Sequence, residues 1–162
     1  MVNKSSKRKG FSLVEMIIVV AVMGILIGGV ALSYNLVRSV DTKGAAYDIN
    51  NSLTDLKSKN MAGNKAVYMH LYRHNAAYYI AYSENETFTA TDEAKKIGNS
   101  SLKITCKDAT GTTSDLSMVH IGIQKKDGAF LCGPSEITIS ANHAPTYKVQ
   151  LIQDTGKHYV EK

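Results

Sequence analysis

The stretch KRKGFSLVEMIIVVAVMGIL, residues 7–26, decides the architecture of this 162-residue chain. From Leu13 to Leu32 the sequence holds sixteen apolar residues, three glycines and one charged residue, Glu15. Twenty helical residues rise about 30 Å, which matches the hydrocarbon core of a bilayer. The apolar side chains outweigh the cost of one acid near a helix end. We therefore predict a membrane-spanning helix, and its carboxylate needs an explanation.

The positive charge of the chain is concentrated before this helix. Four of the five net positive charges lie in residues 1–10, so the basic composition does not indicate a nucleic-acid-binding protein. A basic cluster ahead of an apolar span predicts a cytoplasmic N-terminus and an extracytoplasmic C-terminal part. A removed signal peptide is the alternative, with a weak small-residue site at Ala31 and Ser33, but the apolar run exceeds the roughly 7–15 residues typical of such peptides.

The helical pattern continues beyond the apolar run and becomes amphipathic. Apolar residues recur at spacings of three and four: Leu36, Val40, Ala46, Ile49, Leu53 and Leu56. No proline occurs before Pro134, and Gly63 with Asn64 supplies a stop signal. We predict one helix over residues 11–62, apolar on all sides over 11–32 and on one face over 33–62.

Residues 63–162 show the period-two alternation of strands. The pattern predicts a hairpin from 66–74 and 77–83, then a polar loop over 84–100 with a helical turn at 92–97. Further strands are expected at 101–107, 117–125, 129–132, 136–140, 146–152 and 158–161. The predicted fold class is α+β, a long N-terminal helix packed on a mostly antiparallel sheet.

Two cysteines, Cys106 and Cys132, lie in the part expected outside the cytoplasm. Extracytoplasmic thiols favour a disulfide over a metal site, and we expect these two to be bonded. Two unpaired buried cysteines are the alternative.

The segment KGFSLVEM carries a more specific signal. A short basic leader ends in glycine, an aromatic residue and an apolar run follow, and a glutamate stands five residues after the glycine. This resembles the class III leader of type IV prepilins and type II secretion pseudopilins. The resemblance implies a pilin fold, with cleavage between Gly10 and Phe11 by a prepilin peptidase that also methylates Phe11. It also implies polymerisation with other pilin subunits and contact with an assembly platform protein and its ATPase.

The resemblance suggests a role for Glu15. Cleavage creates an N-terminal ammonium within an apolar helix bundle, where an unpaired charge is costly. The Glu15 carboxylate of a neighbouring subunit can neutralise it, and such a pair penalises every stagger that separates the charges. A glutamate that is merely tolerated near a helix end is the alternative.

The remainder of the chain resembles minor pseudopilins of the GspH/FimT type at the level of pattern. The resemblance lies in the segments DLKSKNMAGNKAVYMHL and YKVQLIQDTGKHYVEK, and it favours a minor subunit over a major one. Many major pilins carry proline at the position of Leu32, and its absence here points the same way. We therefore expect a structural subunit of a type IV pilus, competence pilus or type II secretion-like filament. It would be a single-pass protein of the cytoplasmic membrane that reaches the cell surface on assembly. A membrane-anchored enzyme or binding protein unrelated to pili is a rival class.

No catalytic or metal-binding pattern stands out, so we expect no enzyme activity, cofactor or metal. His70 and His74 would lie about 13 Å apart along a strand, too far to share an ion. The other histidines have no acid or thiol at ligand spacing. Residues 108–115 (DATGTTSD) combine acids and hydroxyls but lack a calcium-loop spacing, which favours a solvated loop.

Aromatic residues on the predicted hairpin suggest a second ligand class. Tyr68, Tyr72 and Tyr78 lie there together with Arg73. An aromatic and basic face of this kind can stack on single-stranded DNA, which would suit a competence pseudopilin. Tyrosine is also an ordinary strand residue whose ring packs while its hydroxyl stays hydrated, and that reading is favoured.

Overall fold

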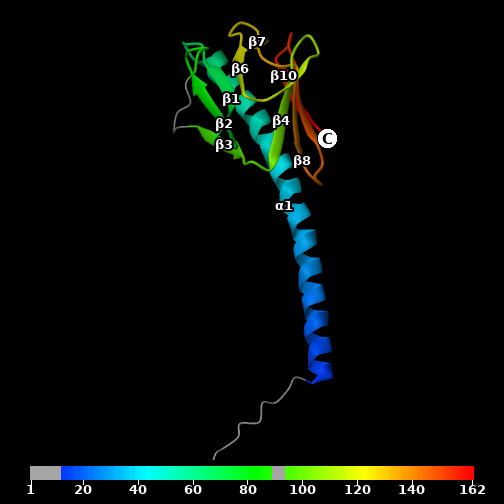
Figure 1. Ribbon diagram of the computed structural model, residues 1–162. Helices are drawn as coiled ribbons and strands as arrows, with labels where there is room; N and C mark the ends of the chain where they lie inside the picture. Colours follow the sequence, from blue (N-terminus) through cyan, green and yellow to red (C-terminus); the bar gives the residue numbers. More distant parts are fainter. Residues whose placement is uncertain (1–11, 89–93) are drawn as a thin grey trace, which may run out of the picture. The chain divides into compact units, whose positions relative to one another are not determined.

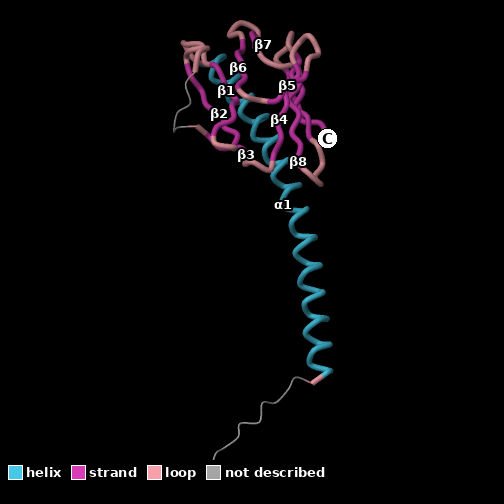
Figure 2. Tube along the Cα trace, viewed as in Figure 1, coloured by secondary structure: helices cyan, strands magenta, loops and turns pink. Residues whose placement is uncertain are grey.

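The computed structural model describes residues 12–88 and 94–162, with only the backbone described for 28–39. It contains one helix, α1 (Leu13–Ala62), and ten strands in its described part (Figures 1 and 2). The strands are β1 (Tyr68–His74), β2 (Ala77–Ser83), β3 (Lys95–Gly98), β4 (Leu102–Lys107), β5 (Thr113–Asp115), β6 (Met118–Ile123), β7 (Phe130–Cys132), β8 (Glu136–Ala141), β9 (Tyr147–Ile152) and β10 (Lys157–Glu161). The chain divides into two units, Met1–Asn35 and Leu36–Lys162.

The strands form two antiparallel sheets of five strands each. Sheet A has the order β3-β2-β1-β6-β7, and sheet B has the order β10-β9-β8-β4-β5. Within the second unit the two sheets lie on either side of the last turns of α1 (Figure 1). The fold is therefore α+β, as predicted, with a long helix packed on antiparallel sheets and an arrangement consistent with a pilin fold.

The core is built around one face of α1. Ala46, Ile49, Leu53 and Leu56 are each 0% exposed and meet buried side chains from both sheets. Four residues of the predicted apolar face are thus confirmed as core. Val40 is not, because its side chain is 69% exposed. It precedes Thr42 and Ala45, the first buried positions among the helix residues whose side chains the structure describes, and Leu36 lies outside those residues.

A buried asparagine joins the end of α1 to the start of β1. Asn60 is 2% exposed, and its Oδ1 accepts a hydrogen bond from the Val67 backbone N–H at 2.8 Å. Its Nδ2 donates to the Val67 carbonyl at 2.8 Å and to the Leu56 carbonyl at 3.1 Å. One side chain therefore satisfies both backbone groups of Val67, as a neighbouring strand would.

Replacing Asn60 with alanine should lower the free energy of unfolding by about 2–3 kcal/mol, because two part-buried backbone groups lose their partners. Asn51→Ala on the exposed face of the same helix is the matched control, expected within about 0.5 kcal/mol of the parent. Urea unfolding of the full chain in mild detergent, followed by circular dichroism, measures both variants. Equal effects would mean that the Val67 backbone finds its partners in water.

The predicted hairpin is confirmed, with Leu71 opposite Ile80 in the ladder between β1 and β2. The predicted helical turn at 92–97 is wrong from Lys95 onward, because β3 begins there and pairs with β2. Only Ile97 of β3 is buried, so the segment lacks the alternation of apolar and polar residues that would predict a strand. The strand β5 was expected as loop for the same reason, since all three of its residues are exposed.

Candidate functional site

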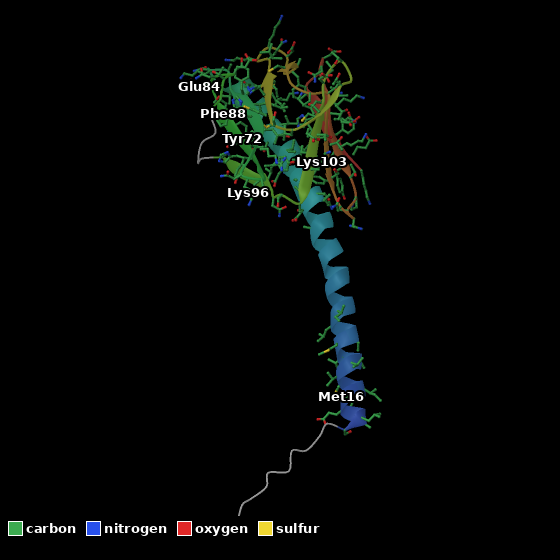
Figure 3. The ribbon with its side chains drawn as sticks, viewed as in Figure 1. Met16, Tyr72, Glu84, Phe88, Lys96 and Lys103 are labelled. Atoms are coloured by element: carbon green, nitrogen blue, oxygen red, sulfur yellow. The ribbon has the colours of Figure 1, made fainter. Side chains whose placement is uncertain are left out.

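Residues 13–27 of α1 expose apolar side chains on every side. Twelve large hydrophobic residues of this segment are 42–76% exposed: Leu13, Val14, Met16, Ile17, Ile18, Val19, Val20, Val22, Met23, Ile25, Leu26 and Ile27. Figure 3 shows these side chains extending from the helix, with Met16 labelled. Apolar exposure on this scale is typical of a surface that lipid or other proteins cover.

Glu15 lies in the first turn of this segment and is exposed. A carboxylate there interacts favourably with the positive end of the helix dipole. It is the only charged side chain between Leu13 and Ile27. The predicted cleavage residues, Gly10 and Phe11, lie outside the described residues.

The predicted membrane span is not confirmed by the structure. Within the described residues, no helix combines enough length with enough apolar character to cross a membrane.

The predicted disulfide is absent, and Cys106 and Cys132 are both free thiols. Cys106 is buried in β4 of sheet B, whereas Cys132 lies in β7 at the edge of sheet A. Both line a cavity of about 290 Å³, but each thiol belongs to a different sheet. Burial raises the pKa of the Cys106 thiol to about 12, and burial also raises the pKa of Cys132. Both sulfurs are therefore neutral, poorly nucleophilic thiols at neutral pH.

The predicted aromatic face for DNA is contradicted at its centre. Tyr72 and Tyr78 are each only 3% exposed, so neither ring presents a surface for stacking. Tyr68 is half-buried, and the Tyr78 hydroxyl accepts a hydrogen bond from the Ile104 N–H at 3.3 Å. The exposed Arg73 guanidinium lies 5.9 Å from the centre of the Tyr78 ring. Tyr72 and Tyr78 are therefore packed into the fold, and the Tyr78 hydroxyl joins sheet A to β4 of sheet B.

Sequence reasoning missed a pair of histidines. His70 in β1 faces His120 in β6 directly across the ladder, with their Nδ1 atoms 2.7 Å apart. His70 is 0% exposed although strand alternation would place it away from the α1 side of sheet A. The two histidines are fifty positions apart in the sequence, and no local pattern predicts a contact between residues so far apart.

The histidines do not form a metal centre in the part of the chain that the structure describes, where no group of three or more ligand side chains gathers.

The acidic loop at 108–115 is held by hydrogen bonds within the loop itself. The Asp108 carboxylate accepts hydrogen bonds from Thr110 and from the Thr112 N–H, which lowers the pKa of that carboxyl.

Comparison with known proteins identifies one feature of the chain. Residues 5–31 match the family model of the prokaryotic N-terminal methylation motif. No curated protein and no solved structure matches the chain. The matched residues include the basic leader, the predicted cleavage residues and Glu15.

The motif and the fold together define a class. A long helix that exposes apolar side chains on all sides and then packs on antiparallel sheets fits a subunit that polymerises through its helix. Over residues 5–31 the motif is that of a class III leader, and it supports a type IV pilin- or pseudopilin-type filament subunit that is processed at the N-terminus.

Proposed function

We propose that this chain is a structural subunit, a minor pilin or pseudopilin of the GspH/FimT type, in a type IV pilus, competence pilus or type II secretion-like filament. Prepilin peptidase removes residues 1–10 and methylates Phe11. The mature helix then joins a bundle of other pilin helices, homopolymeric or mixed, with the aid of a platform protein and an ATPase. The subunit itself has no enzyme activity.

The observation that carries this proposal is the combination of the matched motif with the exposed apolar half of α1. The motif supplies a processing site and a glutamate at the fifth mature position. Residues 13–27 of the helix supply twelve large apolar side chains that are exposed in the described structure. Before assembly, membrane lipid covers this surface, with the basic N-terminus in the cytoplasm and the β-domain outside. After assembly, neighbouring helices replace the lipid.

DNA binding is the weaker candidate, because the tyrosines that motivated it are buried. An unrelated membrane-anchored enzyme is also weaker. In the described residues, no ligand cluster gathers at a metal-like site, and the two thiols have raised pKa values.

The mature N-terminus tests the proposal. Intact mass and N-terminal sequencing of membrane-purified protein should give a chain that begins at N-methyl-Phe11 when the peptidase is present. The same cells without the peptidase should yield the full chain, and so should Gly10→Leu in the presence of the enzyme. A chain that keeps Lys9 and Gly10 despite the peptidase, or that starts near Ser33, would overturn the proposal.

A further inference from the structure

The histidine pair between β1 and β6 has a defined proton arrangement. Ser83 Oγ donates its only proton to the Asn85 carbonyl at 2.5 Å. The contact between His70 Nε2 and Ser83 Oγ at 2.8 Å must therefore be donated by the imidazole. Neutral His70 then has no proton on Nδ1, and the 2.7 Å contact is donated by Nδ1–H of His120. One proton occupies the space between the two rings.

The histidine pair contacts the segment Ser83–Phe88, which begins at the last residue of β2. The Phe88 ring stacks on the His70 ring with centroids 4.5 Å apart and an interplanar angle of 9°. It also contacts Tyr72 at a centroid distance of 5.3 Å. Figure 3 shows Glu84, Phe88 and Tyr72 on the same side of the β-domain. The exposed Lys65–Glu84 ion pair at 2.7 Å adds little, so the segment is attached through His70, which contacts Ser83 and Phe88, and through Tyr72.

We propose that His70 and His120 form a proton-operated latch that holds residues Ser83–Phe88 on the outer face of sheet A. A first added proton is tolerated on either ring, because the two Nδ1 atoms still share one proton: the protonated ring donates and the neutral ring accepts. A second proton leaves an N–H group on each ring facing the other across 2.7 Å. The two positive rings then separate, His70 loses its stacking geometry, and the segment is released.

The cavity of about 290 Å³ connects the pair to solvent. Half-buried His120 lines it, together with Glu86, Asp108, Cys106 and Cys132. Raised pKa values keep both thiols neutral, whereas hydrogen bonds from Thr110 and Thr112 lower the pKa of the exposed Asp108 carboxyl, which stays negatively charged in mild acid. Solvent therefore contacts the pair through His120, whereas His70 is 0% exposed.

The environment of His70 determines whether the latch opens as the pH rises or as it falls. Burial lowers the pKa of His70, the charge of His120 lowers it further, and the Asn85 carbonyl raises it only in part. A depressed histidine pKa favours the neutral form in the folded protein, so the latch is closed at neutral pH. As the pH falls below about 6.5, where free histidine titrates, the closed form loses stability progressively until the pair takes its second proton.

A single-tryptophan variant tests the latch in the full chain in detergent micelles, since the chain contains no tryptophan. Phe88→Trp places the probe on His70. Its emission should shift to the red and its quenching by acrylamide should rise as the pH falls from 8 to 4.5, with a midpoint below 6.5. Far-ultraviolet circular dichroism should stay constant. Tyr159→Trp on exposed β10 serves as the reporter of global unfolding and should show no transition.

Two glutamine substitutions in the Phe88→Trp background isolate the pair. Glutamine at position 120 can donate to neutral His70 or accept from protonated His70 but cannot itself be charged, so His120→Gln should abolish the transition. His74→Gln, at an exposed position of the same strand, should leave it unchanged. A transition that survives His120→Gln, or no transition at all, would overturn the latch.

Imidazole nitrogen chemical shifts of the unsubstituted chain provide a second check that does not depend on tryptophan. Neutral His70 should show a proton on Nε2, and His120 should show one on Nδ1. The reverse assignment for His70 would overturn the latch.

Discussion

Replacing Glu15 with valine is expected to remove the subunit from filaments while leaving it in the membrane. In the proposed filament, the N-terminal ammonium that cleavage creates on Phe11 lies in an apolar helix bundle and has no partner if the carboxylate is gone. An unpaired buried charge costs about 3–5 kcal/mol, which corresponds to a drop in incorporation of roughly 100- to 4,000-fold. Immunoblotting of sheared, sedimented filaments against the membrane fraction measures it.

Three comparisons make the Glu15 result specific. Glu15→Gln keeps the size of the side chain and removes only its charge, so it should fail like valine. Glu161→Gln, at an exposed residue near the chain end, should assemble normally. Membrane association of Glu15→Val should equal or exceed that of the parent, because an acid has left an apolar helix. Normal assembly of both Glu15 variants would contradict a role for the charge in register.

The sequence was most informative where one local period runs over many residues. The helix was predicted over 11–62 and is observed over Leu13–Ala62, because its pattern extends over many turns and ends at a clear stop signal. The hairpin of β1 and β2 was also foreseen, since its strands are adjacent in the chain and alternate clearly. Local patterns fix the kind of element, and short connections fix its neighbour.

Long-range pairing was out of reach of the same patterns. Sheet A places β6 beside β1, and sheet B places β8 between β4 and β9, so two separate sheets form where one was expected. That separation leaves Cys106 and Cys132 in different sheets and unbonded. It also brings His120 opposite His70, which a strand-by-strand prediction cannot anticipate.

The tyrosines show that a strand can be predicted correctly while the exposure of its side chains is predicted wrongly. Alternation placed Tyr72 on the face of β1 opposite Leu71, which would be solvated if nothing covered it. The segment after β2 folds back and sets Phe88 against that face, so both faces of β1 are buried at its centre. The candidate assembly site could be predicted from the sequence, because its residues lie in one contiguous motif and do not depend on long-range strand pairing.

Among the glycines whose surroundings the structure describes, Gly156 is expected to be the least tolerant of a side chain. Gly156 has φ +61°, and its N–H donates to the Ile152 carbonyl at 2.9 Å. A Cβ there would collide with the carbonyl oxygen of Gly128 and lie near Lys57 Nζ. Lys57 itself donates to the Gly156 carbonyl at 3.3 Å, so all three groups are held together.

Gly156→Ala is therefore expected to lower the free energy of unfolding by about 2–5 kcal/mol, from left-handed backbone strain and the clash combined. Gly111→Ala is the matched control, because Gly111 has φ +89° and a Cβ there would meet only Lys107 Cε at 3.8 Å. It should cost only the backbone strain, about 1–2 kcal/mol. Urea unfolding of both full-length variants in mild detergent measures the difference, which isolates the backbone contact between the two turns. Equal losses would show that the turns can separate without cost.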